Sequence, residues 1–275
     1  MSFQPLTKEL VPRPELWQLA LRLSQRQMDV LLYSPMESNS LIYRSVELDA
    51  EVPTRLKAIE AAVYDNPLLL SDFRRVSVIV ENREFMVIPP EVESDEERLT
   101  LMETAYPGFG GKLYCNELGA TNASMILGLD GDEAGFLERT FFNVKIYSHL
   151  TPLCRYFVSA GKRANVCRVY ANLRAGAVDI VIVDHGEVKL LNTMACREWM
   201  DSVYYILASY KTLNLNAMET ELLICGSAEV REDVMPMLRN YVGSVMPVVF
   251  PSEMFKAGRD AMKAPFDLIV LPLCE

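Results

Sequence analysis

The stretch Tyr170-Ala-Asn-Leu-Arg-Ala-Gly-Ala-Val-Asp-Ile-Val-Ile-Val183 decides the fold of this chain. Both of its ends are rich in residues that favour strands, and the dipeptide Ala175-Gly176 between them is typical of a tight turn. A second turn at Asp184-His185-Gly186-Glu187 leads to a further strand at Val188–Asn192, and a helix follows at about Trp199–Leu213. The sequence therefore predicts a βββα unit.

A second stretch, Leu19-Ala-Leu-Arg-Leu-Ser-Gln-Arg-Gln-Met-Asp-Val-Leu-Leu-Tyr33, follows the same plan about 150 residues earlier. Asp29 and Asp179 occupy equivalent places, because each is followed by four residues that favour strands. An extended segment at Ser40–Leu48 and a helix opened by Pro53 complete this unit. The repetition predicts an internal duplication, and with it two related lobes with a cleft between them.

Strands and helices are expected to alternate through the rest of the chain. Strands are predicted at Arg75–Val80, Glu84–Ile88, Lys112–Leu118, Ala123–Leu127, Asn143–Ser148, Glu221–Cys225, Val245–Val249 and, closing the chain, Phe266–Leu271. Helices are predicted after the N-caps Ser94 and Asp132, at Pro152–Ala160 with an end at Gly161, at Val230–Val242 and at Ser252–Ala261. The first two strands of this set are expected to form a hairpin through Glu81-Asn82-Arg83.

This alternation predicts an α/β protein with an N-terminal lobe at residues 1–148 and a C-terminal lobe at residues 149–275. A duplicated βββαβα lobe resembles the actin-like ATPase fold, a ribonuclease H-like architecture shared by actin, Hsp70 and sugar kinases. The chain looks most like the pilus-assembly and cell-division actin-like proteins. It specifically resembles an uncharacterised family of actin-like domains with no assigned activity. The resemblance covers nearly the whole chain and implies a nucleotide site between the lobes.

The resemblance also makes a statement about chemistry. In active members of this fold, the turn between the first two strands of each lobe carries Asp-x-Gly, whose glycine lets backbone amides approach a phosphate and whose aspartate holds the metal. The first turn here places Arg22 and Ser24 at these positions, and the second places Asn172 and Arg174 there. A slip of two residues would let Gly176 serve the second turn, but no slip restores the first. Without these carboxylates Mg²⁺ lacks an anchor, so we expect no ATP hydrolysis.

A third element of the resemblance lies at Leu222-Leu-Ile-Cys-Gly-Ser-Ala228. This segment is similar to the strand-to-helix adenosine loop of the family, which normally reads Gly-Gly. Gly226 would admit the base and ribose closely, whereas Ser227 departs from the pattern. The simpler interpretation, which we favour, is a strand that ends in a Gly-Ser turn and caps the next helix.

Other motifs match no known site by spacing. The glycine-rich segment Pro107–Lys112 lacks the first glycine and the final Ser or Thr of a phosphate-binding loop. The acidic segment Asp130–Glu133 does not fit a calcium loop. With only His149 and His185, the chain cannot form a histidine-rich metal site, and no nucleophile stands in a recognisable motif with either. We therefore expect no metal and no catalytic residue.

Composition excludes further classes of function. The net charge is −10, which disfavours binding to nucleic acid. No apolar run reaches the roughly 18 residues that span a bilayer, so direct membrane insertion is not expected. The six cysteines form no Cys-x-x-Cys pair and no signal sequence is seen, which indicates reduced thiols and a cytoplasmic protein.

Three functions remain open on these grounds. The one we expect is a non-hydrolysing scaffold or subunit that needs no cofactor and binds another cytoplasmic protein. The alternative is a kinase or ATPase that uses Mg-ATP at a rearranged phosphate site, where Arg22 and Arg174 could bind an anion directly. A filament-forming protein is the third, and the sequence sets no oligomeric state. If some of the fourteen methionines gather on the surface, they would suit an adaptable protein-binding face.

Overall fold

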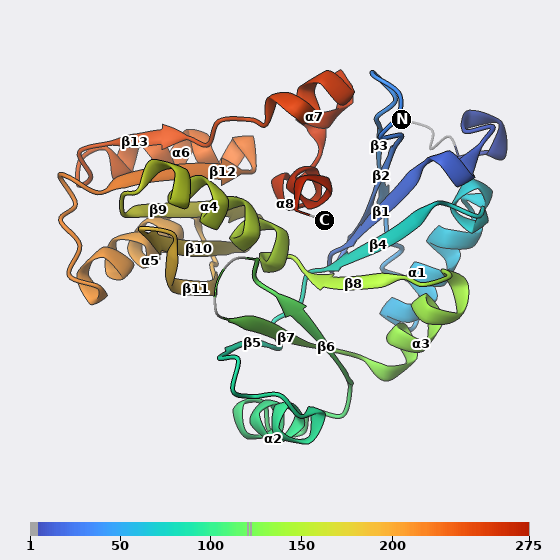
Figure 1. Cartoon of the computed structure of the whole chain (residues 1–275), viewed down its shortest axis with the longest axis horizontal. Helices are drawn as coiled ribbons and strands as arrows, with labels where there is room; N and C mark the ends of the chain where they lie inside the picture. The colour runs from blue at the N-terminus through green and yellow to red at the C-terminus, as the bar shows by residue number, and fades with distance from the viewer. Residues whose placement is uncertain (1–4, 120, 122, 275) are drawn as a thin grey trace. The chain divides into compact units, whose positions relative to one another are not determined.

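A computed structural model describes residues 5–119, 121 and 123–274. The chain forms two compact units, each assembled from three segments (Figure 1). Unit 1 consists of Met1–Asn116, Ser124–His149 and Pro251–Ala264, and unit 2 consists of Glu117–Ala123, Leu150–Phe250 and Pro265–Glu275.

The centre of unit 1 is a five-stranded sheet with the strand order β3-β2-β1-β4-β8. Its strands are β1 (Gln18–Leu23), β2 (Gln27–Tyr33), β3 (Ile42–Glu47), β4 (Arg75–Val80) and β8 (Lys145–Ser148). Strands β1, β2 and β3 form an antiparallel meander, whereas β4 runs parallel to β1 and β8 runs parallel to β4. The predicted meander is therefore present.

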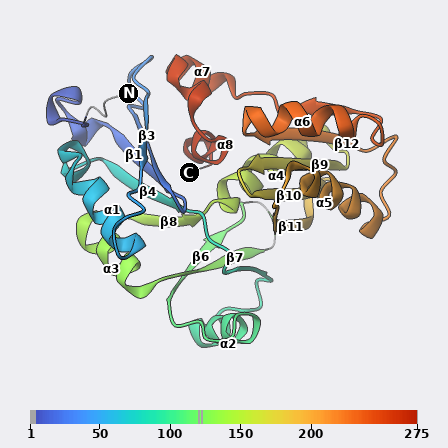
Figure 2. The ribbon, with the colours of Figure 1, turned by 180° about the vertical axis from the view of Figure 1, so that it is seen from behind.

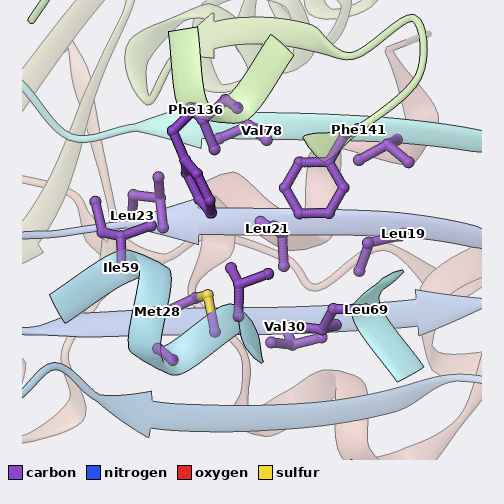
Figure 3. Packing of buried hydrophobic residues seen from close by; sticks show 14 of the residues in the cluster. Leu19, Leu21, Leu23, Met28, Val30, Ile59, Leu69, Val78, Phe136 and Phe141 are labelled. Carbon is purple, nitrogen blue, oxygen red and sulfur yellow. The ribbon is translucent and has the colours of Figure 1, made fainter. Parts of the chain in front are cut away.

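One face of this sheet carries the core of unit 1. Helices α1 (Arg55–Tyr64) and α3 (Gly131–Thr140) cover it. Alternate residues of β1, such as Leu21, meet Ile59 of α1 and Phe136 of α3 there (Figure 3). Side chains alternate between the two faces of a strand, so Arg22 lies on the opposite face.

A small three-stranded sheet is inserted in unit 1 between β4 and α3. It has the order β5-β7-β6, with β5 (Phe85–Ile88), β6 (Lys112–Glu117) and β7 (Ser124–Leu129), and α2 (Asp95–Ala105) packs beside it. The predicted hairpin between β4 and β5 is wrong, because β4 pairs with β1 and β8 while β5 pairs with β7. The predicted capping of α2 by Ser94 is confirmed by a capping box with Glu97.

Unit 2 contains a second five-stranded sheet, with the order β11-β10-β9-β12-β13. Its strands are β9 (Arg168–Arg174), β10 (Ala177–Asp184), β11 (Glu187–Ala195), β12 (Glu221–Gly226) and β13 (Val245–Pro247). The order matches that of the unit 1 sheet, strand for strand along the chain. The meander is again antiparallel, and β12 runs parallel to both of its neighbours.

Helices lie on both faces of the unit 2 sheet (Figure 2). Helices α5 (Trp199–Thr212) and α6 (Ala228–Leu238) pack against each other and cover the face that carries Ala171 of β9. Helices α4 (Leu150–Ala164) and α8 (Phe266–Val270) also pack together. On their side, the ring of Phe157 from α4 stacks on Tyr170 of β9 with 4.1 Å between centroids.

The structure differs from the prediction in the type of one element and in the bounds of several others. The closing segment is the helix α8 rather than a strand, because a short, fully buried apolar run does not distinguish the two by periodicity. Helix α4 continues past Gly161 to Ala164, and this glycine instead permits close packing, because a Cβ atom there would lie 2.7 Å from Cγ1 of Val183. The N-cap of α3 is Asp130, whose carboxylate accepts from the backbone N–H groups of Asp132 and Glu133.

Short elements complete the chain. They are α7 (Ser252–Ala257) and the 3₁₀ turns Lys8–Leu10, Pro14–Leu16, Pro67–Leu70, Arg259–Lys263 and Leu271–Leu273. In unit 1, the segment that contains α7 lies beside the start of β3, where Leu41 N–H donates to the Ala257 carbonyl at 3.0 Å.

Candidate functional site

Arg22 and Asn172, two of the four residues predicted at the phosphate turns, occupy matching register positions in the two sheets. In unit 1, Arg22 of β1 lies opposite Asp29 of β2. In unit 2, Asn172 of β9 lies opposite Asp179 of β10. The predicted equivalence of Asp29 and Asp179 therefore holds at the level of strand pairing.

Arg22 in unit 1 is held between two carboxylates. Its Nη2 donates to Oε2 of Glu81 at 2.9 Å, and its Nη1 lies 3.6 Å from Oδ2 of Asp29. The Tyr43 hydroxyl donates to Oδ1 of the same Asp29 at 2.8 Å. Burial, followed by the negative charge of Asp29, raises the pKa of Tyr43, so the phenol keeps its proton. Arg22 is only 6% exposed, and its charge is matched within the protein.

Hydrogen bonds of the Ser24 and Arg55 side chains close the turn that follows Arg22. The Ser24 hydroxyl accepts from the backbone N–H of Gln27 at 3.0 Å and from that of Arg26 at 3.4 Å. The Ser24 N–H donates to the Gln27 carbonyl at 2.9 Å, and the guanidinium of Arg55 reaches the Ser24 carbonyl. Arg55 also pairs with Glu133 of α3. The amides that would face a phosphate at this turn are thus bonded to a serine side chain.

Unit 2 contains a denser cluster around Asp179, which is 0% exposed. Its Oδ2 accepts from Asn172 Nδ2 at 2.9 Å and from Arg174 Nε at 2.8 Å. Its Oδ1 accepts from Arg174 Nη2 at 2.7 Å and from the Thr193 hydroxyl at 2.8 Å. An ionised carboxylate has about four lone-pair sites, and these four hydrogen bonds occupy them.

The turn between β9 and β10 consists of Ala175 and Gly176, because Arg174 already pairs with Ala177. Gly176 has a φ of +78°, a conformation that favours glycine in a two-residue turn. Its carbonyl accepts from Cys196 N–H at 2.9 Å. The tight turn between β9 and β10 therefore accounts for Gly176, and no ligand is needed to explain it.

Gly226 and Ser227 lie beside the Asp179 cluster, at the end of β12. Gly226 has a φ of +94°, and a Cβ atom there would lie 2.0 Å from the Leu173 carbonyl oxygen and 2.8 Å from Oδ1 of Asn172. The Ser227 N–H donates to the same Leu173 carbonyl at 2.7 Å. Ser227 stands at the N-cap position of α6, but its side chain makes no capping hydrogen bond. The strand-turn-helix geometry is as favoured from the sequence, whereas capping by the serine side chain is wrong.

Several members of these clusters were not predicted from the sequence. They are Tyr43, Glu81, Thr193 and Cys225, whose Sγ lies 3.5 Å from Asn172 Oδ1. Each belongs to another strand of its sheet or directly follows one. Tyr43 and Cys225 fall within predicted strands, whereas Glu81 falls in a predicted turn and Thr193 directly follows a predicted strand, so no sequence motif marks them as members of a site.

The histidines and acidic groups form no metal centre within the described part of the chain. No group of three or more His, Cys, Asp or Glu side chains there is arranged to hold an ion. His185 is exposed at the β10–β11 turn, and His149 is fully buried after β8. Among the described residues, no helix has both the length and the apolar character that crossing a membrane requires.

Comparisons with known proteins agree on the fold. The model of a family described as "Protein of unknown function (DUF3822)" matches residues 12–245. A Bacteroides thetaiotaomicron protein described as having an actin-like ATPase fold and unknown function is 24% identical, with a TM-score of 0.81 over 96% of this chain and 98% of that one. A chain of the PilM-PilN type IV pilus biogenesis complex is 12% identical, with a TM-score of 0.57 over 95% and 98%. No curated protein matches. The chain has an actin-like ATPase fold with two sheet-rich units.

Proposed function

We propose that this chain, which belongs to the DUF3822 family of proteins of unknown function, is an actin-fold protein that does not hydrolyse ATP and works by binding another protein. The family model spans most of the chain but assigns no function, so the proposal rests on the geometry of the candidate site. The observation that carries the proposal is the state of Asp179. All of its lone-pair sites are taken by Asn172, Arg174 and Thr193.

Metal binding would require this cluster to open. Mg²⁺ takes oxygen ligands in a near-octahedral arrangement and usually reaches a nucleotide through one or two carboxylates. To reach Asp179, the ion would displace Arg174 and leave its guanidinium buried without a counter-charge, which is costly. In unit 1, Arg22 lies between Asp29, with Nη1 3.6 Å from Oδ2, and Glu81, to which its Nη2 donates at 2.9 Å.

Phosphate binding at the first turn faces a second obstacle. Backbone amides cradle phosphates when they are free to donate. Here the amides of Arg26 and Gln27 already donate to the Ser24 hydroxyl. A phosphate would have to displace the Ser24 hydroxyl from these two amides.

Arg22 and Arg174 provide little free positive charge for an anion. Each guanidinium contacts at least one buried or half-buried carboxylate, and their side chains are 8% and 10% exposed. An anionic ligand would therefore find little net positive charge at either cluster. This argues against the version of the nucleotide hypothesis in which arginines replace the metal.

Binding to a protein partner is the remaining use of the fold that has a structural parallel. The pilus relative was solved as part of the PilM-PilN complex, so an actin-like fold of similar length can serve as a partner-binding subunit. We propose the same partner-binding role for the present chain and do not specify the partner.

The decisive experiment measures nucleotide binding by the full chain. Mg-ATP, Mg-ADP and metal-free ATP are each added at millimolar concentration, the melting temperature is recorded, and any shift is checked by titration calorimetry. A ligand with a micromolar Kd would stabilise the protein by about 4 kcal/mol at 1,000 times Kd, which is readily seen.

We expect no shift with any of the three nucleotides. A shift that requires Mg²⁺ and is lost in Asp179→Asn would overturn the proposal. Gly110→Ala supplies the matched control, because a methyl group at Gly110 meets nothing within 4 Å and should leave both melting temperature and binding unchanged.

A further inference from the structure

Helix α5 of unit 2 differs from the other long helices of the chain in its outer face. Its sequence, Trp199-Met-Asp-Ser-Val-Tyr-Tyr-Ile-Leu-Ala-Ser-Tyr-Lys-Thr212, contains two charged residues, Asp201 and Lys211, with none between them. Its inner face is occupied, since Val203, Ile206 and Tyr210 are buried in the core of unit 2.

The outer face of α5 is nevertheless apolar. Residues 200, 204, 208 and 211 follow helical spacing along one stripe, which reads Met, Tyr, Ala, Lys, and the half-buried Leu207 lies at its edge, packed against the core of unit 2. Tyr204 is 67% exposed and Met200 is 43% exposed. Trp199 borders the stripe and is 37% exposed. A helix with apolar residues on opposite faces is typical of one that is covered on both sides.

Unit 1 provides an internal comparison. Helix α1 follows the third strand of its sheet as α5 follows the third strand of the other, so the two helices hold the same place in topology. Yet α1 presents Lys57 and the half-buried Glu60 toward solvent, and α6, next to α5, presents Glu229, Glu232 and Asp233. Helix α1 also exposes the aromatic Tyr64, at 57%, but it has Lys57 and Glu60 on the same side, whereas α5 exposes Trp199, Met200 and Tyr204 together.

We propose that the outer stripe of α5 is a self-association surface, on which α5 of a second copy of this chain packs antiparallel about a two-fold axis. Such an axis near Tyr205 places Tyr204 of each copy against the Leu207–Ala208 segment of the other, where the small alanine permits close approach. Aromatic and methionine side chains are enriched at such interfaces.

Charge complementarity favours a second copy of this chain as the partner and an antiparallel arrangement of the two α5 helices. Lys211 at the end of α5 would lie beside Glu198 and Asp201 at the start of the partner helix, and the two helix dipoles would oppose each other favourably. A parallel pair would instead place lysine against lysine and aspartate against aspartate. In the antiparallel arrangement, the charges of this surface are thus complementary to those of an identical surface on a second copy.

The expected dimer is weak. A 14-residue helix is about 21 Å long, and one pair of such helices buries less than the roughly 1,200 Å² of a stable standard interface. The predicted Kd is therefore in the range of about 1–100 µM. This proposal does not depend on whether the chain binds nucleotide.

Sedimentation analysis of the full chain from about 1 to 300 µM tests it. We expect a monomer–dimer equilibrium, and at least about a tenfold weaker association in Tyr204→Lys, because two new charges meet near the axis. Tyr241→Lys is the matched control, since Tyr241 is 53% exposed in unit 2 but lies outside α5. Lys211→Glu should weaken the dimer, and adding Glu198→Lys should restore it.

Each other outcome overturns the proposal. A chain that stays monomeric to the highest concentration has no such interface, and if Tyr204→Lys then blocks capture of a different protein, the stripe serves that partner instead. A dimer that is unchanged in Tyr204→Lys, or that is weakened equally in Tyr241→Lys, uses another surface. Melting temperatures of all variants establish that they fold.

Discussion

Replacing Arg174 with methionine removes the counter-charge of a fully buried carboxylate. In the native protein, Nε and Nη2 of Arg174 donate to the two oxygens of Asp179 at 2.8 and 2.7 Å. Arg174→Met keeps a long apolar side chain but removes the charged donor and leaves Asp179 with neutral donors such as Asn172 and Thr193. Breaking a buried ion pair on one side costs about 3–5 kcal/mol.

This cost should be visible as a loss of thermal stability. For units of this size, 1 kcal/mol corresponds to about 4 °C in melting temperature, so we expect Arg174→Met to melt about 12–20 °C lower. Calorimetry and urea unfolding of the full chain would measure it, read as shifts of the transition that belongs to unit 2.

A second variant separates the lost charge pair from lost packing. In Arg174→Met with Asp179→Asn, both charges of this buried pair are gone, and the amide can still bond Asn172 and Thr193. We expect the double variant to recover at least half of the lost stability. A single variant that costs less than about 1 kcal/mol, or a double variant that is no better, would refute the picture of a closed ionic cluster.

Three further changes test other parts of the fold. Gly226→Ala should destabilise by at least about 2 kcal/mol, because its Cβ would meet backbone at 2.0 Å with φ at +94°, while Gly110→Ala should be neutral in the same melting experiment. Asn116→Leu should cost about 2–4 kcal/mol in urea unfolding, because the buried amide bonds the backbone of β8 twice, and a cost near zero would mean that water replaces those bonds. Lys112→Met should lower stability by at most about 1 kcal/mol at pH 7. The hydrogen bond from Lys112 lowers the pKa of Glu138 below its ordinary value of 4.5. The stability that this ion pair contributes is therefore present above pH 4.5 and disappears as the pH falls through the lowered pKa. A stability difference between Lys112→Met and the native protein that persists in acid would show that the lysine acts through packing.

Much of the fold can be predicted from the sequence because its strands are marked by local chemistry. The run Val178–Val183 is almost entirely β-branched and apolar, and the turns on either side contain glycine at positive φ. These signals act over a few residues, so neighbouring context does not override them. The meander of each sheet follows directly.

Other parts of the fold depend on partners that lie far away in the chain. The segment Phe266–Val270 is apolar throughout and is buried throughout, so its own sequence does not distinguish a helix from a strand. Packing against α4 decides it. In the same way, β5 pairs with β7 across an insertion of more than thirty residues, and the nearer hairpin with β4 is excluded because β1 and β8 occupy both edges of that strand.

The candidate site shows the same division. The alignment of Asp29 with Asp179 follows from a repeated local pattern, and strand pairing places Asp29 opposite Arg22 and Asp179 opposite Asn172. The roles of Tyr43 and Thr193 depend on the third strand of each meander, whose register is set by turns and bulges. Sequence pattern therefore locates the strands that build each cluster and leaves the hydrogen-bond partners to tertiary structure.

The return of the C-terminal segment to unit 1 has a consequence for biosynthesis. The segment Pro251–Ala264 belongs to unit 1, and its Ala257 carbonyl accepts from the N–H of Leu41 near the opposite end of the chain. About 200 residues separate the two groups, and at 5–20 residues per second a ribosome needs roughly 10–40 s to supply the second after the first. During that interval the start of β3 lacks its native cover, so nascent chains stalled before Pro251 should engage chaperones more strongly than the released protein.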